Sequence, residues 1–309
     1  MTRVLVTGAN GFVCSNIVFT LLQQGYSVVA VDRAFDAALV EAWTGQPVEL
    51  VTSDLTRLPD STVDFVIHGA AITADPADGE TPAGHFRANV LPALTLLDWA
   101  HEHAVKRVIF ISSSAVFRGS PISVLTEDTP VATDGLLYAV EKHSVELLLA
   151  ALKQTYGRDV VAIRLGNIYG EHEHIRATRP RVSLVARLIN EALTTGRVSI
   201  PRASSPTDWT YAADVGRALS RLLDVPTLPH ALYHVTSGQV LTAVDILTAL
   251  RAALPEVTIT AEHTPAVPFR GYMTPDRLFR DTGFKQWTDF RSGLRQTVAW
   301  FKAQMEHSS

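Results

Sequence analysis

The stretch Arg3-Val4-Leu5-Val6-Thr7-Gly8-Ala9-Asn10-Gly11-Phe12-Val13-Cys14 decides the fold. Its β-branched run predicts a strand, and the closely spaced glycines lead into a helix of apolar periodicity that reaches Gly25. A strand, a glycine turn and a helix in this order place a pyrophosphate on the amides of the helix N-terminus. A single glycine-rich turn can also serve simply as a tight turn that binds no ligand. Its place directly after the first strand nevertheless favours a dinucleotide-binding site. The contacts expected here are Gly8, Asn10, Gly11, Phe12 and Val13.

The second predicted strand, residues 27–32, ends in Asp32, about 20 residues after the glycines. A carboxylate at this place is expected to hydrogen-bond the ribose hydroxyls of an adenosine. It would also repel a 2′-phosphate, so the sequence favours NAD over NADP. Arg33 follows directly and softens that preference, and we expect it at the same ribose.

Tyr138 and Lys142 lie four residues apart in a strongly helical stretch, which puts both side chains on one helix face. A free tyrosine has a pKa of about 10, so a phenolate base near neutrality needs about 4 kcal/mol of stabilisation. A neighbouring ammonium can supply much of that. The pair alone is equally typical of a solvated helix face, but the dinucleotide turn in the same chain favours a catalytic pair.

With these residues the chain resembles the extended short-chain dehydrogenase/reductases, the NAD-dependent sugar epimerase/dehydratase group. The family's turn, Gly-x-x-Gly-x-x-Gly, is matched at Gly8 and Gly11, whereas its third position is Cys14. Because the third glycine lets helix and strand approach closely, a thiol should cost some packing or displace the helix. Cys14 is otherwise expected to be a small buried side chain.

The resemblance implies further cofactor contacts. Asp54 and Leu55 resemble the family's Asp-Leu pair, whose carboxylate contacts the adenine amino group. Residues 68–71 are similar to the His-x-Ala-Ala turn that lies along the cofactor, so Ala70 and Ala71 are expected there. Asn89 matches the asparagine that helps to shape the site from the family's long helix, and Tyr138 and Lys142 complete the predicted cofactor contacts.

The serine-rich run 112–117 resembles the segment that supplies the family's catalytic hydroxyl, here Ser113, with Ser114 as the alternative or as a substrate contact. In the chemistry that the resemblance implies, Tyr138 takes the proton of a substrate hydroxyl and the serine orients the substrate oxygen. Lys142 holds the nicotinamide ribose and lowers the tyrosine pKa, and hydride passes to the ring.

Residues 164–170 resemble the family's Arg-x-x-Asn-x-Tyr-Gly, in which the asparagine, here Asn167, touches the substrate. The substrate loop should follow at 171–181, where Arg176 and Arg179 could grip a carboxylate or phosphate. The alternative is a mobile charged surface loop. Two histidines alternate with glutamates there, but the family needs no metal and nothing supplies a further ligand, so no metal site is expected.

Two departures from the family narrow the expected reaction. Ser114 and Ala115 stand where the 4,6-dehydratases carry an Asp-Glu pair, so dehydration is disfavoured. Thr207 replaces an arginine that binds the diphosphate in nucleotide-sugar epimerases, which weakens a nucleotide-sugar substrate unless Arg202 or Arg270 substitutes.

Three functions follow as hypotheses. An NAD-dependent oxidoreductase acting on a hydroxyl of a sugar, sugar acid or related polyol is slightly favoured, because Thr207 removes the usual nucleotide anchor. An NAD-dependent sugar epimerase that keeps its cofactor uses the same Ser-Tyr-Lys set. A dinucleotide sensor without catalysis is the third, disfavoured by the retained Tyr-Lys pair.

The composition fits an α/β enzyme: 309 residues, 47% of them hydrophobic, with a formal net charge of −4. No basic run points to nucleic acid, no apolar stretch is long enough for a membrane span, and no signal peptide is apparent. The single cysteine is consistent with the cytoplasm. A homodimer through the helix after Asn89 and the helix of Tyr138 is expected from the resemblance.

Alternating strands and helices to about residue 165 predict a Rossmann-type, doubly wound parallel sheet, followed by a smaller C-terminal α+β substrate lobe. The predicted dinucleotide-binding domain covers residues 1–168 plus 203–230. The predicted substrate-binding lobe covers 169–202 plus 231–309, and the substrate should lie between the two, outside the carboxyl ends of the strands.

Overall fold

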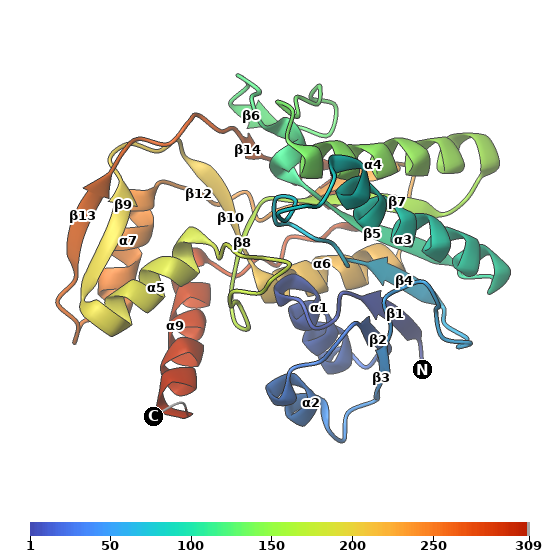
Figure 1. The fold of residues 1–309 in the computed structure, drawn as a ribbon, viewed down its shortest axis with the longest axis horizontal. Helices are drawn as coiled ribbons and strands as arrows, with labels where there is room; N and C mark the ends of the chain where they lie inside the picture. Colours follow the sequence, from blue (N-terminus) through green and yellow to red (C-terminus); the bar gives the residue numbers. More distant parts are fainter. Residues whose placement is uncertain (308–309) are drawn as a thin grey trace.

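The computed structural model describes residues 1–307, which form a larger lobe built on a parallel sheet and a smaller lobe beside it (Figure 1). The sheet has seven strands in the order β11-β7-β5-β4-β1-β2-β3, every neighbouring pair parallel. Because the chain runs outward from β1 in one direction and then from β4 in the other, the switch point lies between these two strands. The strands are β1 (Arg3–Thr7), β2 (Ser27–Asp32), β3 (Val48–Thr52), β4 (Phe65–His68), β5 (Arg107–Ser113), β7 (Val160–Leu165) and β11 (Leu232–Val235).

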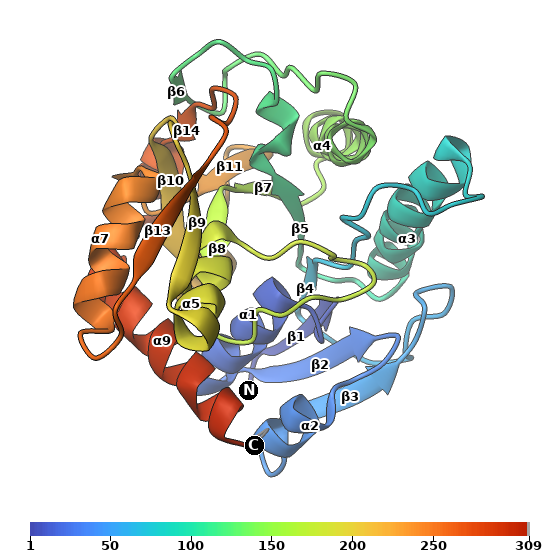
Figure 2. The ribbon, with the colours of Figure 1, turned by 60° about the vertical axis from the view of Figure 1, so that its left-hand side comes forward.

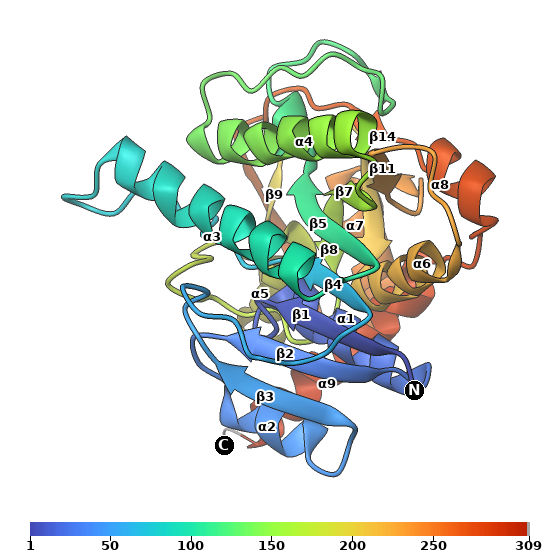
Figure 3. The same ribbon diagram turned by 90° about the vertical axis from the view of Figure 1, so that its right-hand side faces the viewer.

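Helices cover both faces of this sheet, as Figure 3 shows. Alternate strand residues turn to opposite faces, so Val4 and Val6 join the core under one helical layer and Leu5 joins the core under the other. Strands buried on both faces read as continuous apolar runs. The predicted doubly wound sheet is confirmed. One layer holds α1 (Phe12–Gln23), α2 (Ala37–Trp43) and α6 (Ala212–Asp224); the other holds α3 (Pro82–Glu102) and α4 (Leu137–Tyr156).

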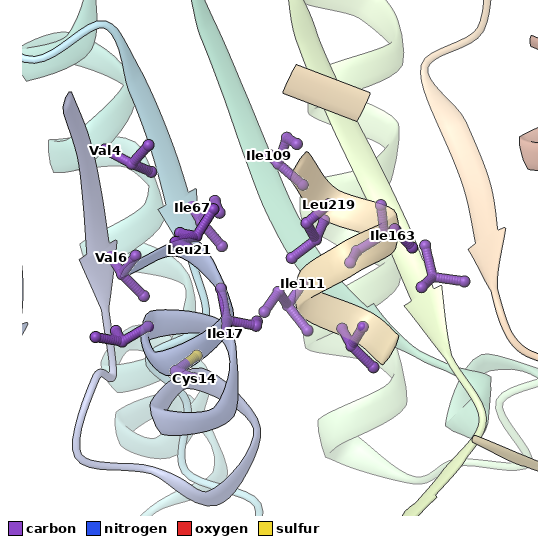
Figure 4. Packing of buried hydrophobic residues seen from close by; sticks show 14 of the residues in the cluster. Val4, Val6, Cys14, Ile17, Leu21, Ile67, Ile109, Ile111, Ile163 and Leu219 are labelled. Atoms are coloured by element: carbon purple, nitrogen blue, oxygen red, sulfur yellow. The ribbon is translucent and has the colours of Figure 1, made fainter. Parts of the chain in front are cut away.

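The core under α1 and α6 is closely packed (Figure 4). Ile17 and Leu21 of α1 and Leu219 of α6 are fully buried against the sheet. Burying a side chain of this size contributes about 1.5–3 kcal/mol. Gly216 lets the two helices meet, because a Cβ there would lie 2.5 Å from the Cβ of Thr20.

The smaller lobe has its own hydrophobic core and lies beside the carboxyl ends of the large sheet (Figure 1). Its helices are α5 (Leu184–Thr195), α7 (Ala243–Ala253) and α9 (Phe290–His307). Its strands are the parallel pair β9 (Arg197–Pro201) and β13 (Thr260–Thr264), and the trio β8 (Asn167–Tyr169), β10 (Thr207–Tyr211) and β12 (Val240–Leu241). Smaller elements are η1 (Ser114–Phe117), β6 (Val124–Leu125), β14 (Tyr272–Met273) and α8 (Asp276–Thr282).

The segment at residues 232–235 lies in a different lobe from the one that the predicted boundaries assign to it. It was expected in the smaller lobe, yet it forms β11 at the edge of the large sheet, where Tyr233 pairs with Ile163 of β7. The helix α8 packs against it, and Leu278 joins the core of the large sheet. The chain therefore enters the first lobe again at α6 and stays there through β11, and it returns once more at α8. None of the helices described up to residue 307 has the length and apolar character that crossing a membrane requires.

Candidate active site

The glycine turn between β1 and α1 is built as a phosphate-binding turn needs. Gly8 has a φ of +72°, and a Cβ on it would lie 2.7 Å from the backbone nitrogen of Ala70, so only glycine fits. The amide of Gly11 donates to the carbonyl oxygen of Gly8 at 2.8 Å. No side chain caps the start of α1. The amides of its first turn are thus available to a pyrophosphate, and the residues present fit a dinucleotide.

The residues predicted to hold the adenosine gather in one cavity of about 640 Å³. The Asp32 carboxylate ends β2 and accepts from the amides of Asn10 at 2.9 Å and Arg33 at 2.7 Å. Hydrogen bonds from the hydroxyl and amide of Thr56 hold the pKa of Asp54 below its usual value. Asp54 is therefore a carboxylate at neutral pH. The other predicted residues that line this cavity are Gly8, Gly11, Leu55, Ala70, Ala71 and Asn89.

A second cavity, of about 620 Å³, brings Ser113, Tyr138 and Lys142 together at the ends of β5 and α4. It shares several lining residues with the adenosine cavity, so the two form one continuous site over the carboxyl ends of the strands. Those shared residues are Gly8, Gly11, Gly69, Ala71, Arg176 and Thr178.

Of the two candidate serines, Ser113 and Ser114, only Ser113 lines the cavity of Tyr138. It is the last residue of β5 and lines the cavity, and its Oγ accepts from the amide of Ala115 at 3.1 Å. Its hydroxyl also lies close enough to Tyr138 to lower the pKa of that side chain, although burial outweighs this effect. Ser114 begins η1 and does not line this cavity. The geometry therefore favours Ser113 as the hydroxyl beside the tyrosine, and it gives Ser114 no contact with the substrate space.

The Tyr138 and Lys142 side chains are both held in the cavity wall. Lys142 Nζ donates to the carbonyl oxygen of Ile111 at 2.9 Å and lies 5.6 Å from the centre of the Tyr138 ring. Burial lowers the pKa of Lys142 to about 8 and raises the pKa of Tyr138 to about 12. The Ser113 hydroxyl and the charge of Arg179 only partly oppose the shift at Tyr138. The expected lowering of the tyrosine pKa is thus not achieved by these side chains alone, because desolvation outweighs them.

Cys14, at the third position of the glycine motif, is accommodated by a second glycine. Its Sγ lies where the Cβ of any other residue at position 69 would be, because a Cβ on Gly69 would come within 2.2 Å of it. Cys14 itself is buried on the sheet-facing side of α1 (Figure 4). The packing cost expected for a thiol is therefore offset by the missing side chain of Gly69.

This complementarity predicts a double-mutant effect. Gly69→Ala should lower the free energy of unfolding by about 1–3 kcal/mol, because the new methyl group overlaps the thiol. Cys14→Ala removes the Sγ atom, so the Cys14→Ala/Gly69→Ala protein should recover most of that loss. Urea unfolding of the four proteins measures the coupling. Equal effects of Gly69→Ala in both backgrounds would contradict this account.

Residues 171–183 form a strap over the site, reaching out from β8 across the large sheet and returning to α5 (Figure 2). The Glu173 carboxylate joins the two ends of the strap, accepting from the amide of Ser183 at 2.8 Å and its hydroxyl at 2.6 Å. On the opposite wall, the amide and the Oγ1 of Thr73 donate to the carbonyl oxygen of Thr178, at 2.9 and 3.1 Å. The strap is therefore fixed at both walls of the site.

The two arginines predicted to bind substrate belong to this strap. Arg176 forms an ion pair with Asp36, which also lies 3.2 Å from Nε2 of His174. Arg179 forms an ion pair with Glu173, and its guanidinium lies 5.0 Å from the centre of the Phe12 ring. Both arginines line the cavity of Tyr138. These contacts favour an ordered substrate loop over a solvated charged loop, although Arg181 of the same segment is exposed.

The far end of the cavity lies in the smaller lobe. Asn167 on β8 lines the cavity, and its Nδ2 donates to the carbonyl oxygen of Asp208 at 3.0 Å. Thr207 lines the cavity with two arginines, Arg187 of α5 and Arg270. Among the described residues that line this cavity none is an aspartate or glutamate, whereas five are lysine or arginine. A ligand with negative charge suits such a surface.

Several residues of the site have no sequence signal that would have found them. Asp36 and Thr73 contact the strap from more than 100 residues away in the chain. Arg187 belongs to an amphipathic helix, where an arginine is ordinarily a solvated residue. Glu141 is the exception, because it lies inside the Tyr138–Lys142 motif. An acidic residue at that position is a signal that could have been used from the sequence alone.

A parallel sheet with a glycine turn, an Asp at the end of β2 and a Tyr-Lys pair on α4 defines a dinucleotide-dependent enzyme of the short-chain dehydrogenase/reductase type. Residues 4–232 match the model of the NAD dependent epimerase/dehydratase family, and the chain belongs to that family. Its cofactor is NAD.

Relatives and solved structures agree in fold over the whole chain. The dTDP-glucose 4,6-dehydratase of Streptomyces niveus is 25% identical over 319 residues, covering 97% of this chain and 93% of that protein. The UDP-glucose-4-epimerase of Stenotrophomonas maltophila, solved with NAD and formylated UDP-arabinopyranose, has a TM-score of 0.84 at 23% identity, covering 100% of both chains. MoeE5, solved with UDP-glucose and NAD, has a TM-score of 0.81 at 25% identity, covering 98% of this chain and 99% of that one.

Proposed function

We propose that the protein is an NAD-dependent oxidoreductase that transfers a hydride at a carbinol carbon of a sugar, sugar acid or related polyol. One observation carries this proposal: Ser113, Tyr138 and Lys142 converge in a cavity that is continuous with the dinucleotide cavity. A non-catalytic sensor would have no use for this convergence. The same three residues would also serve an NAD-dependent sugar epimerase, the second candidate function.

The three side chains divide the work on the substrate hydroxyl. NAD, when bound, supplies the hydride acceptor and a positively charged ring beside the site. Tyr138 Oη takes the hydroxyl proton, and Ser113 Oγ orients the substrate oxygen. Lys142 would hold the ribose of a bound cofactor, and its Nζ, 5.6 Å from the centre of the Tyr138 ring, adds positive charge. Positive charge is needed there because burial raises the pKa of Tyr138 to about 12.

The charge of the cavity supports an anionic sugar as substrate. Arg187 and Arg270 line the end remote from Tyr138, near Thr207, and either can hold a phosphate or carboxylate. Thr207 therefore need not exclude a sugar nucleotide, the class of substrate named for several relatives. The lining residues include no carboxyl group, and this supports the prediction against dehydration, which needs an extra acid and base.

An NAD-dependent sugar epimerase is the second candidate, and the strap favours it. Arg176, which pairs with Asp36, and Thr178, which is held by Thr73, line both cavities. A cofactor that occupied both cavities would be released only when these contacts break. Retention of the cofactor through turnover suits an epimerase, which re-forms the same carbinol with the opposite configuration.

The first experiment follows absorbance of reduced nicotinamide while the purified protein meets NAD and a panel of sugars, sugar acids and nucleotide sugars. Chromatography of the products runs in parallel. Continuing NADH release with one substrate class supports the oxidoreductase and names that class. An isomerised product without net NADH supports the epimerase. Silence across a panel that includes all three classes contradicts both.

The strap contacts predict slower release of NAD than an open site would give. Arg176→Met should raise the NAD dissociation rate about three- to tenfold, because it removes a partly buried charge-assisted contact to Asp36. Stopped-flow fluorescence with excess competing nucleotide measures the rate without any substrate. The control is Arg181→Met on the same strap, whose side chain is exposed. Equal rates in the two variants would argue against the latch.

We also propose a homodimer through α3 and α4. Leu91 and Leu94 of α3 and Leu147 of α4 are exposed, and an apolar groove lies between the start of the two helices. Leu94→Glu should therefore shift the protein to a monomer in sedimentation velocity, because a carboxylate would be buried in the interface. Leu50→Glu on β3 is the control, since Leu50 is also exposed but lies on the far edge strand.

A further inference from the structure

A buried histidine and glutamate lie directly behind the catalytic pair. Glu141 stands between Tyr138 and Lys142 in α4, and its side chain is 1% exposed. Facing it from α3, the His85 side chain is 0% exposed. The two are joined by a contact of 2.7 Å between His85 Nδ1 and Glu141 Oε1. The mechanism above uses neither residue.

Both ring nitrogens of His85 face hydrogen-bond acceptors. Nε2 lies 3.0 Å from the carbonyl oxygen of Ala74, which can only accept, so Nε2 carries a proton. With Glu141 ionised, a neutral ring would turn its Nδ1 lone pair toward a carboxylate oxygen 2.7 Å away, which is repulsive, so Nδ1 carries a proton as well. Asn89 Nδ2 donates to the other carboxylate oxygen at 2.6 Å and stabilises its charge. The arrangement is that of an imidazolium on a carboxylate.

The same network holds the turn at residues 72–74. Asn89 accepts from the amide of Ile72 at 2.7 Å and donates to the carbonyl oxygen of Ile72 at 3.0 Å, while His85 holds Ala74. Thr73, between these two anchors, lines the catalytic cavity and binds the strap through Thr178. The buried pair is thus linked to the wall of the cofactor site by an unbroken series of hydrogen bonds.

We propose that His85 is a positioning residue for the cofactor. Its imidazolium, fixed between Glu141 and the carbonyl oxygen of Ala74, fastens the 72–74 turn to the catalytic helix and so holds NAD between that turn and the strap. The proposal deepens the proposed function and rests on it for the site, but it concerns the binding of NAD and is independent of the substrate.

The charges around the pair set the direction of a pH effect. Burial lowers the pKa of His85, but the hydrogen bond and charge of Glu141 outweigh it, with Glu80 adding in the same direction, so the pKa lies above its ordinary value. On the side of α4, Glu141 faces Tyr138 and Lys142. Above its folded pKa the ring loses its Nδ1 proton and repels the carboxylate. NAD affinity should therefore fall as pH rises through the folded pKa of His85.

Two variants separate the hydrogen bonds from packing. His85→Gln keeps a donor toward Glu141 but cannot titrate, so its NAD affinity should stay within about threefold of wild type at neutral pH. In this variant NAD affinity should no longer fall at the pH where His85 loses its proton. Only the fall in NAD affinity caused by deprotonation of Lys142, with its pKa of about 8, should remain. His85→Leu has no donor, so it should bind NAD at least about tenfold more weakly at every pH. The control is His101→Gln on the last turn of α3, where His101 is exposed and lies 3.1 Å from Arg158.

Nitrogen-15 spectra of the wild-type histidines test the protonation state directly. At pH 7, where an ordinary histidine is mostly neutral, His85 should show two protonated ring nitrogens. A singly protonated His85 at pH 7, or wild-type NAD affinity in His85→Leu, would overturn the proposal. Should His85→Leu fail to fold, the spectrum and the pH profile of His85→Gln decide. Failure of every sugar to react would reject the proposed function and leave these readouts unaffected.

Discussion

Tyr138→Phe is expected to lower kcat by roughly 10²- to 10⁴-fold, the usual contribution of a positioned acid–base group. The substitution removes the only oxygen of a side chain that lies close to the Ser113 hydroxyl and over Lys142. NAD affinity should change little, since the aromatic ring remains in the cavity wall. Because the pKa of Tyr138 is raised to about 12, the wild-type rate of oxidation should also rise with pH as the phenolate fraction grows.

The matched control for this variant is Tyr156→Phe, on the last turn of the same helix. Tyr156 is 70% exposed, far along α4 from the cavity, so its hydroxyl should not affect kcat. Steady-state kinetics with the substrate class found in the panel give kcat, and fluorescence titration gives the affinity for NAD. More than about a tenth of wild-type turnover in Tyr138→Phe would reject the tyrosine as the base.

The large sheet could be predicted because its signals are local. The glycine turn, the apolar strands and the Asp at the end of β2 each lie within about 30 residues, the length of one βαβ unit. Contacts between distant segments leave no such signal. Cys14 reads as a defect in the glycine motif until Gly69, 55 residues further on, is seen to make room for it.

The smaller lobe and the strap show the same limit. The sequence of a four-residue strand such as β11 does not indicate which sheet the strand will join. Its pairing with β7, where Tyr233 lies opposite Ile163, is seen only in the folded chain. In the strap, Arg176 could be assigned to a ligand by residue type, but its contact with Asp36 depends on how two lobes meet. The proposed catalytic residues could therefore be singled out from the sequence, whereas the contacts between the strap and the rest of the site could not.

A buried ion pair beneath the site should dominate the stability of this region. Glu146 Oε2 accepts from Arg164 Nη2 at 2.7 Å and Oε1 from Arg164 Nε at 2.9 Å, with the two side chains 5% and 3% exposed. The hydroxyl of Ser112 also donates to Glu146. These contacts join α4, β5 and β7, the three elements that carry or support Ser113 and Tyr138.

Glu146→Gln should lower the free energy of unfolding by about 3–5 kcal/mol, because the Arg164 guanidinium would remain buried without its counter-charge. Burial alone would raise the pKa of Glu146, but Arg164, His143 and Ser112 together lower it to about 2. A carboxylate with a lowered folded pKa stabilises the protein above its unfolded pKa of about 4.3, and this contribution is lost as pH falls toward 2.

Urea unfolding from pH 8 to pH 3 therefore provides the test. The gap between wild type and Glu146→Gln should be constant from pH 8 to about pH 6 and narrow steadily below about pH 5. Asp64→Asn is the control, since its partner Lys106 is 67% exposed and the pair should contribute no more than about 1 kcal/mol. A gap that did not narrow in acid would mean that Glu146 stabilises the fold through its shape and hydrogen bonds and not through its charge.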